Sequence, residues 1–215
     1  MRVRTRRTFR TANRGMPFEE LLEYTNKRYM NHNEAIMCKQ HTKFIPIRNA
    51  YGQVVNCKVE EKATVDFMGR YKGMPTAIEA KHTSKDRINF SEVKYHQSMF
   101  LESFRANGYG FSGVIVSFKM DRFFLVPWPF WEAARSAWEN RKDLKSRKAE
   151  KIIVKEYGVT WQTPGKASVS ADELPKEFEV KTDRKYGLPY LTKIEDYMNI
   201  VKSKDVAAVE INGKL

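Results

Sequence analysis

The chain has 215 residues, enough for one domain with a full hydrophobic core but cramped for two independent domains. Its apolar fraction of 41% excludes wholesale disorder. Lys and Arg outnumber Asp and Glu by 39 to 26, which gives a net charge of +13. This excess favours a polyanionic partner, because each phosphate contact releases condensed counterions. Nucleic acid is therefore the leading candidate; a simply basic soluble protein and a binder of anionic membrane surfaces are the alternatives.

The sequence gives no support for several other classes of protein. Cys38 and Cys57 form no CxxC pair, and no secretory signal or long apolar run is present. We therefore expect reduced thiols, a cytoplasmic location and no membrane partner. The four histidines have no zinc-like spacing. The motif GxxxxGK[ST] does not occur, so nucleotide hydrolysis has no motif here.

The first third of the chain begins with residues 1–14, which contain six arginines and no acid and are expected to form a flexible basic arm. A helix is predicted over residues 17–31, because Pro17 suits a first helical position and apolar residues then recur with helical spacing. A short strand is expected at 35–39. Two β-prone runs about the turn-rich residues 49–52 predict a projecting hairpin of about residues 45–62.

The middle of the chain predicts a second hairpin and a second helix. The runs KATVDFMG and PTAIEAKH are separated by residues 69–73, whose glycines permit a tight reversal. The helix is expected from Ser91, a plausible N-cap, to Gly108, a plausible C-terminal stop. A strand pair about residues 119–121 and a helix over 128–139 follow. This order of elements predicts an α/β fold.

The last third has weaker patterns. Residues 141–155 are Lys-rich and the next stretch is turn-rich, with no clear periodicity in either, so about 140–170 is interpreted as a basic insertion. A final helix is expected around 191–202. The chain is thus divided into the basic arm, one domain over residues 15–205 and a tail over 206–215.

The residues that carry chemistry lie on the second predicted hairpin. Glu79 and Lys81 are two apart on a strand and therefore share a face, and the turn can fold Asp66 against them. Two carboxylates beside a lysine suit Mg²⁺-dependent phosphodiester hydrolysis. Asp66 and Glu79 would hold the metal, the carbonyl of Ala80 could add an oxygen, and Lys81 would stabilise the transition state or orient the attacking water. The alternative is a surface ion pair worth under ~1 kcal/mol, but Glu79 lies in a run that otherwise favours burial.

Three neighbouring side chains are further candidates, each with an ordinary structural alternative. Glu19, seven residues before Asn26 on the first helix, could face the metal pocket or simply solvent. Gln97 falls within the apolar stripe of the second helix, where its amide could orient a phosphate or bond to backbone. Thr64, two residues before Asp66, could ligate metal or be a plain strand residue.

Together these residues resemble the RecU-type Holliday junction resolvases of low-GC Gram-positive bacteria and their phages, within the PD-(D/E)xK nuclease superfamily. The resemblance rests on residues 13–16 leading to Glu19 and Asn26, on the thirteen-residue step from Asp66 to Glu79-Ala80-Lys81, and on His96-Gln97. It extends through FFLVPWPFW and more faintly through ADELPKEFEV to residues 190–197, and so covers most of the chain.

The resemblance implies a restriction-endonuclease-like core with a mixed sheet, flanking helices and a hairpin stalk. It implies a homodimer that cuts four-way DNA junctions with paired nicks, using Mg²⁺ or Mn²⁺. Metal-site roles would fall on Thr64, Asp66, Glu79 and Gln97, with Lys81 as the stabilising cation. The stalk looks short, which leaves open a nuclease for other branched or duplex DNA, and a non-catalytic basic binder is a third possibility. The expected DNA contacts are basic residues of the arm and of the two hairpins: Arg4, Arg6, Arg7, Arg10, Arg14, Arg48, Lys58, Arg70 and Lys72.

Overall fold

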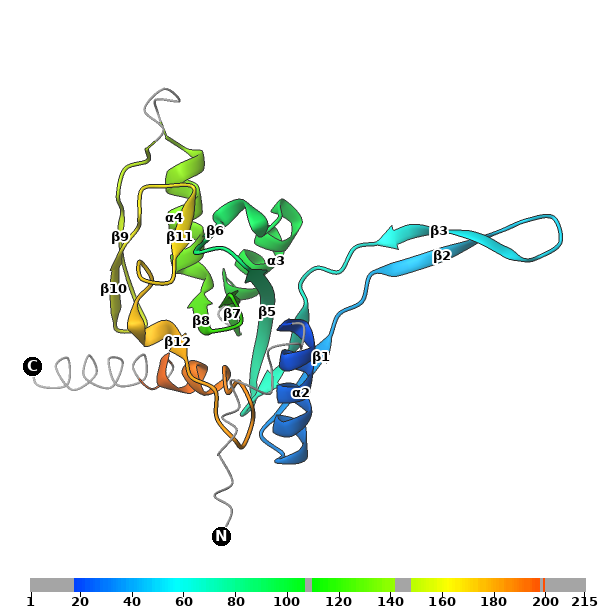
Figure 1. Ribbon diagram of the computed structural model, residues 1–215, viewed down its shortest axis with the longest axis horizontal. Helices are drawn as coiled ribbons and strands as arrows, with labels where there is room; N and C mark the ends of the chain where they lie inside the picture. The colour runs from blue at the N-terminus through cyan, green and yellow to red at the C-terminus, as the bar shows by residue number, and fades with distance from the viewer. Residues whose placement is uncertain (1–17, 107–109, 142–147, 198, 200–215) are drawn as a thin grey trace, which may run out of the picture.

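A six-stranded sheet forms the centre of the computed structural model, which describes residues 18–106, 110–141, 148–197 and 199 (Figure 1). The strand order is β1-β4-β5-β7-β8-β12. The β5–β7 pair is parallel and the other neighbours are antiparallel, so the sheet is mixed, as the family resemblance implies. The strands are β1 (Ala35–Lys39), β4 (Phe67–Tyr71), β5 (Met74–Thr83), β7 (Phe111–Phe118), β8 (Arg122–Pro127) and β12 (Glu179–Val180).

Helices cover both faces of this sheet. Every residue of β7 is buried, which matches its continuous apolar run and its central position. On one face lies α2 (Phe18–Asn31), whose buried residues recur every three or four positions. On the other face α3 (Tyr95–Ala106) packs on β5 and β7, and α4 (Trp128–Glu139) packs on β7 and β8. The predicted helices and strands in this part of the chain are confirmed.

The β4–β5 hairpin has the antiparallel pairing that the sequence predicts. Its two glycines, Gly69 and Gly73, have different structural roles. Lys72 and Gly73 both have positive φ and make the reversal. Gly69 instead lies inside β4, where an added Cβ would be only 1.8 Å from the carbonyl oxygen of Ile36. Gly69 therefore allows β1 to approach β4, and the prediction that it belongs to the reversal is wrong.

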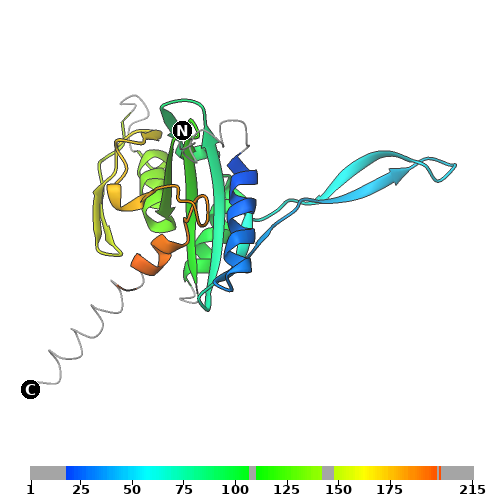
Figure 2. The ribbon, with the colours of Figure 1, turned by 60° about the horizontal axis from the view of Figure 1, so that its bottom comes forward.

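A second hairpin projects away from the sheet, as Figures 1 and 2 show. It consists of β2 (Lys43–Arg48) and β3 (Val54–Glu61) about a turn in which the amide N–H of Gly52 donates to the carbonyl of Asn49. Every residue of β2 is exposed. The predicted hairpin is confirmed, and its isolation means that its surface is available to a large partner.

Several elements differ from the sequence predictions. Ser91 is not a helix N-cap, because it lies in a 3-10 turn (Phe90–Glu92) and α3 starts four residues later. The region interpreted as an insertion forms β9 (Ile153–Glu156) and β10 (Val159–Gln162), which pair with each other, and β11 (Ser168–Ser170), which pairs with β6 (Arg87–Asn89). These strands are too short to give a periodic signal.

Some predictions lie outside the described residues. They include the basic arm with Arg4, Arg6, Arg7, Arg10 and Arg14, the helix stop at Gly108, and the tail. Residues 192–197 are helical, as expected for the last helix. In the described part of the chain, no helix combines the length and apolar character needed to cross a membrane.

The segment after β12 crosses to α2 and anchors it to the body. The hydroxyl of Tyr190 donates to Oδ1 of Asn26 at 2.7 Å, and the backbone N–H of Leu188 donates to the Thr25 hydroxyl at 3.2 Å. Tyr29 is buried between the rings of Tyr71, Tyr186 and Tyr190. The role of Asn26 is therefore structural. Its Oδ1 accepts the hydrogen bond from Tyr190 and so joins α2 to a segment that is distant in the sequence.

We predict that Tyr190→Phe lowers the free energy of unfolding by about 1–3 kcal/mol, because it leaves the buried Oδ1 of Asn26 without a donor. Urea titration measures the change. Tyr51 lies in the turn of the β2–β3 hairpin and is 89% exposed. Tyr51→Phe is therefore the matched control and should leave the free energy of unfolding unchanged. Equal stability of Tyr190→Phe and wild type would contradict this role.

Candidate active site

The β4–β5 hairpin brings the two predicted carboxylates together. Phe67 pairs with Ile78, so Asp66, the residue just before β4, lies across from Glu79. Oδ2 of Asp66 accepts a hydrogen bond of 2.8 Å from the backbone N–H of Ala80, and its carbonyl accepts one of 2.8 Å from Gln40. Asp66 is therefore held by β5 and by the residue that follows β1, although it lies at a bend rather than in β4 itself.

Glu79 is fully buried, and its two carboxylate oxygens have different environments. Oε1 accepts hydrogen bonds from Nζ of Lys81 and, at 2.7 Å, from Nε2 of Gln97. Oε2 is buried and accepts no hydrogen bond from a donor in the part of the chain that the structure describes. A buried carboxylate oxygen without a donor is costly. A cation bound at this oxygen, beside Asp66, would be stabilised by the negative charge there.

This environment changes the acidity of Glu79. Burial disfavours the ionised carboxyl and, together with the nearby negative charge of Asp66, raises the pKa of Glu79 to about 7; the cation of Lys81 only partly opposes the shift. The Glu79 carboxyl therefore binds a proton more readily than an exposed glutamate does. A bound cation would favour the ionised form.

Gln97 contributes from the first turn of α3. Its Oε1 accepts a hydrogen bond of 2.8 Å from the backbone N–H of Lys94, as a capping side chain does, while its Nε2 donates to Glu79. The side chain is half-buried rather than part of the apolar stripe. In this conformation Gln97 presents a donor to Glu79, with its own oxygen turned toward Lys94.

The other two candidates, Thr64 and Glu19, lie outside β4, β5 and α3. Thr64 belongs to a bend before β4, so the alternative that it is a plain strand residue is wrong. Glu19 is on α2, which covers the sheet face opposite to α3, and its Oε2 is 2.9 Å from Nζ of Lys39. The side chain of Lys39 also contacts Glu23, at 2.7 Å. Sequence reasoning missed Lys39, although its place at the end of a predicted strand was a usable signal.

The predicted DNA contacts that the structure describes fall in two places. Arg48 and Lys58 are exposed on the projecting hairpin. Arg70 and Lys72 lie at the far end of the β4–β5 hairpin, where Arg70 donates to the carbonyl of Gly73 and Lys72 pairs with Glu195 at 2.6 Å. Arg70 is four residues from Asp66, or about 13 Å along an extended strand. The structure thus does not gather these four cations beside the carboxylates.

Comparison with known proteins agrees with this arrangement. The family model of RecU, described as Recombination protein U, matches residues 13–169. The chain belongs to the RecU family. A Bacillus cytotoxicus protein named Holliday junction resolvase RecU is 33% identical over 157 residues, covering 68% of this chain and 75% of the relative.

Other relatives carry the same name. The Lactobacillus helveticus protein is 24% identical over 195 residues, covering 87% of this chain and 80% of the relative. The Streptococcus oralis protein is 34% identical over 97 residues, covering 42% of this chain and 49% of the relative, so that this chain spans about half the length of that protein. The match to the family model includes both carboxylates, Lys81 and Gln97.

The donor set of this RecU-family chain fits a hard divalent cation. Mg²⁺ is usually held by one or two carboxylates and keeps several waters. Asp66 and Glu79 supply two carboxylates, and the unpartnered Oε2 of Glu79 needs a positive neighbour. No cluster of three or more His, Cys, Asp or Glu side chains occurs among the described residues.

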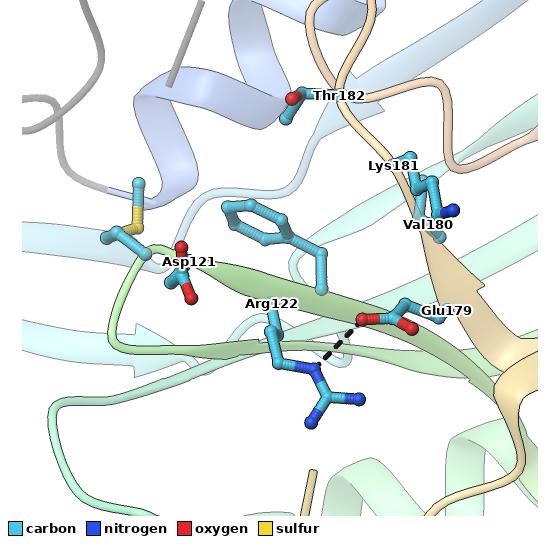
Figure 3. Close-up of a pocket in the computed structure, with 8 residues that line it drawn as sticks. Asp121, Arg122, Glu179, Val180, Lys181 and Thr182 are labelled. Carbon is cyan, nitrogen blue, oxygen red and sulfur yellow. Dashed lines mark hydrogen bonds and ion pairs between the residues drawn. The ribbon is translucent and has the colours of Figure 1, made fainter. Parts of the chain in front are cut away.

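A cavity of about 360 Å³ lies away from this site, beside the β8–β12 edge of the sheet (Figure 3). Two of its charged lining residues, Arg122 and Glu179, pair with each other. Nε of Arg122 is 2.9 Å from Glu179, and Nη1 of the same side chain is 2.5 Å from Asp172.

We predict that Glu79→Gln becomes more stable relative to wild type as the pH rises, in the absence of divalent ions. The folded protein keeps the Glu79 proton up to a pKa of about 7, whereas the unfolded chain releases it near 4.5. The stabilising contribution of the protonated form is thus complete below 4.5 and is lost as the pH rises through 7.

The difference in the free energy of unfolding should grow by roughly 3 kcal/mol at most, measured by urea titration in EDTA from about pH 5 to 8. Glu20→Gln, on the exposed surface of α2, controls for the loss of one carboxylate. A pH-independent difference for Glu79→Gln would contradict the prediction.

Proposed function

We propose that this RecU-family protein is a metal-dependent endonuclease that resolves four-way DNA junctions by paired symmetric nicks, during recombination or repair in the bacterial cytoplasm. The observation that carries the proposal is the fully buried Glu79 with one unpartnered oxygen, next to Asp66 and Lys81. The names of the relatives support the substrate, and the net charge of +13 supports a nucleic-acid partner. The mixed sheet and the two-carboxylate-and-lysine hairpin support a PD-(D/E)xK nuclease core.

Each residue of the site has a definite task under this proposal. Asp66 and Glu79 would hold Mg²⁺ or Mn²⁺, with Thr64 and Gln97 as further candidate ligands. The bound cation would supply Lewis acidity at the scissile phosphate. Lys81, whose side chain is 19% exposed, would place a positive charge beside the phosphate oxygens on which negative charge develops. Glu19 would act only from the edge of the site, through Lys39.

The projecting β2–β3 hairpin supports a branched substrate. Figures 1 and 2 show it extending well beyond the body, and it carries Arg48 and Lys58. A protruding, basic hairpin can enter the open centre of a four-way junction, which a linear duplex does not offer. We also propose a homodimer, because a two-fold symmetric junction is served by two active sites related by a two-fold axis.

We predict that Asp66→Ala, Glu79→Gln and Lys81→Ala each reduce kcat on a labelled four-way junction by about 100-fold or more, because each removes a group that acts on the developing charge. Gel analysis of the nicked strands with Mg²⁺ measures the rate. Glu20→Ala removes an exposed acid from α2 and should cut as wild type does. If Asp66→Ala cleaves at the wild-type rate, the site is wrong. If neither wild type nor Asp66→Ala cleaves with Mg²⁺, the protein is better described as a non-catalytic nucleic-acid binder.

The substrate is tested separately, by replacing residues 44–59 with a two-residue Asn-Gly turn. We predict that this variant loses most of the preference for junction over linear duplex of the same sequence while still nicking DNA, since the catalytic residues lie outside the hairpin. Wild type should nick both symmetric strands within the lifetime of one complex. Equal cleavage of junction and duplex by wild type would instead indicate a nuclease for duplex or other branched DNA.

A further inference from the structure

A buried arginine on α4 lies behind the active-site helix. Arg135 is 8% exposed. Its Nη1 donates to the carbonyl of Val93 at 3.3 Å and to the hydroxyl of Ser98, while Nε donates to Glu139 at 2.8 Å. Val93 and Ser98 bracket the start of α3. One guanidinium therefore contacts both the residue that leads into α3 and the first turn of the helix.

These contacts continue without interruption to Glu79. The amide N–H and hydroxyl of Ser98 both donate to the carbonyl of Lys94, at 2.9 and 3.1 Å. The N–H of Lys94 donates to Oε1 of Gln97, and Nε2 of Gln97 donates to Oε1 of Glu79. The turn that Arg135 holds is thus the turn whose backbone orients the Gln97 amide.

The burial of Arg135 has a desolvation cost that its contacts must offset. A buried guanidinium loses hydration, and the carboxylate that it contacts, that of Glu139, has a side chain that is 49% exposed. Trp131 already joins α4 to the segment before α3. Its ring contacts Phe90, and its Nε1 donates to the Phe90 carbonyl at 3.3 Å. The additional effect of Arg135 is to fix the position of residues 93–98.

We infer that Arg135 is a positioning residue for the nuclease site, acting through the first turn of α3 on Gln97 and hence on Glu79. With Oε1 of Glu79 held by Gln97 and Lys81, Oε2 is the oxygen left toward Asp66 and the cation. Loss of Arg135 frees the α3 turn, and Gln97 then no longer fixes the carboxylate. This inference rests on the proposed function for its kinetic consequence but not for its structural one.

The test compares Arg135→Met, which keeps an unbranched side chain of related length, with Ser98→Ala and Glu139→Gln. We expect Arg135→Met to lower kcat on the four-way junction about tenfold with little change in KM, and to weaken Mn²⁺ binding measured by calorimetry. Ser98→Ala, which favours the helix and leaves Arg135 in place, should have a smaller effect of the same kind. Glu139→Gln should match wild type in both measurements.

A double-mutant cycle separates positioning from general destabilisation. In a Gln97→Ala background, Arg135→Met should cause no further loss of kcat, because the residue through which it acts is gone. An equal loss in both backgrounds would overturn the inference. So would unchanged amide hydrogen exchange at Ser98 and unchanged Mn²⁺ affinity in Arg135→Met. If wild type binds Mn²⁺ but cuts no DNA, the proposed function fails, whereas exchange and affinity still decide the role of Arg135.

Discussion

The fully buried carboxylate of Glu79 is the constraint on which the active site depends. A carboxylate in the middle of a sheet is tolerated only if its charge is neutralised or shared. Here one oxygen is held by a lysine two residues along the same strand and by a glutamine from the helix above. The second oxygen has no donor, and burial raises the pKa of Glu79 to about 7. The fold thus holds a buried carboxylate oxygen whose unfavourable desolvation a bound cation would offset.

The rest of the fold holds this group in place. β5 pairs with β4 on one side and with the fully buried β7 on the other, so Glu79 cannot move outward with its strand. Asp66 is fixed by backbone donors of both its neighbours, Gln40 and Ala80. The residues after β6 are anchored in turn by β11, whose strand pairs with β6, and by the N–H of Phe90, which donates to the carbonyl of Ala167. The region interpreted as a basic insertion therefore supports the segment leading to α3.

The sequence was informative wherever one local pattern determined the geometry. Alternation along a strand is enough to place Glu79 and Lys81 on one face, and helical spacing is enough to find α2 and α4. The sequence was less informative where contacts with other elements determine the structure. The start of α3 is set by contacts with α4 and with Gln97 rather than by the side chain of Ser91, and Lys94 does not belong to the residue types that favour N-caps. The contact of Asn26 with Tyr190 spans 164 residues and leaves no local signal.

Under the proposed function, chemistry and substrate choice rest on different parts of the chain. The carboxylates need rigid, buried strands, because their relative position decides whether a cation is held. The β2–β3 hairpin is exposed over its whole first strand and contributes no residue to the carboxylate group. Its length and charge can therefore vary among RecU relatives without disturbing Glu79. Cleavage chemistry is thus expected to be the more constant property of this architecture, and the form of DNA that it accepts the more variable one.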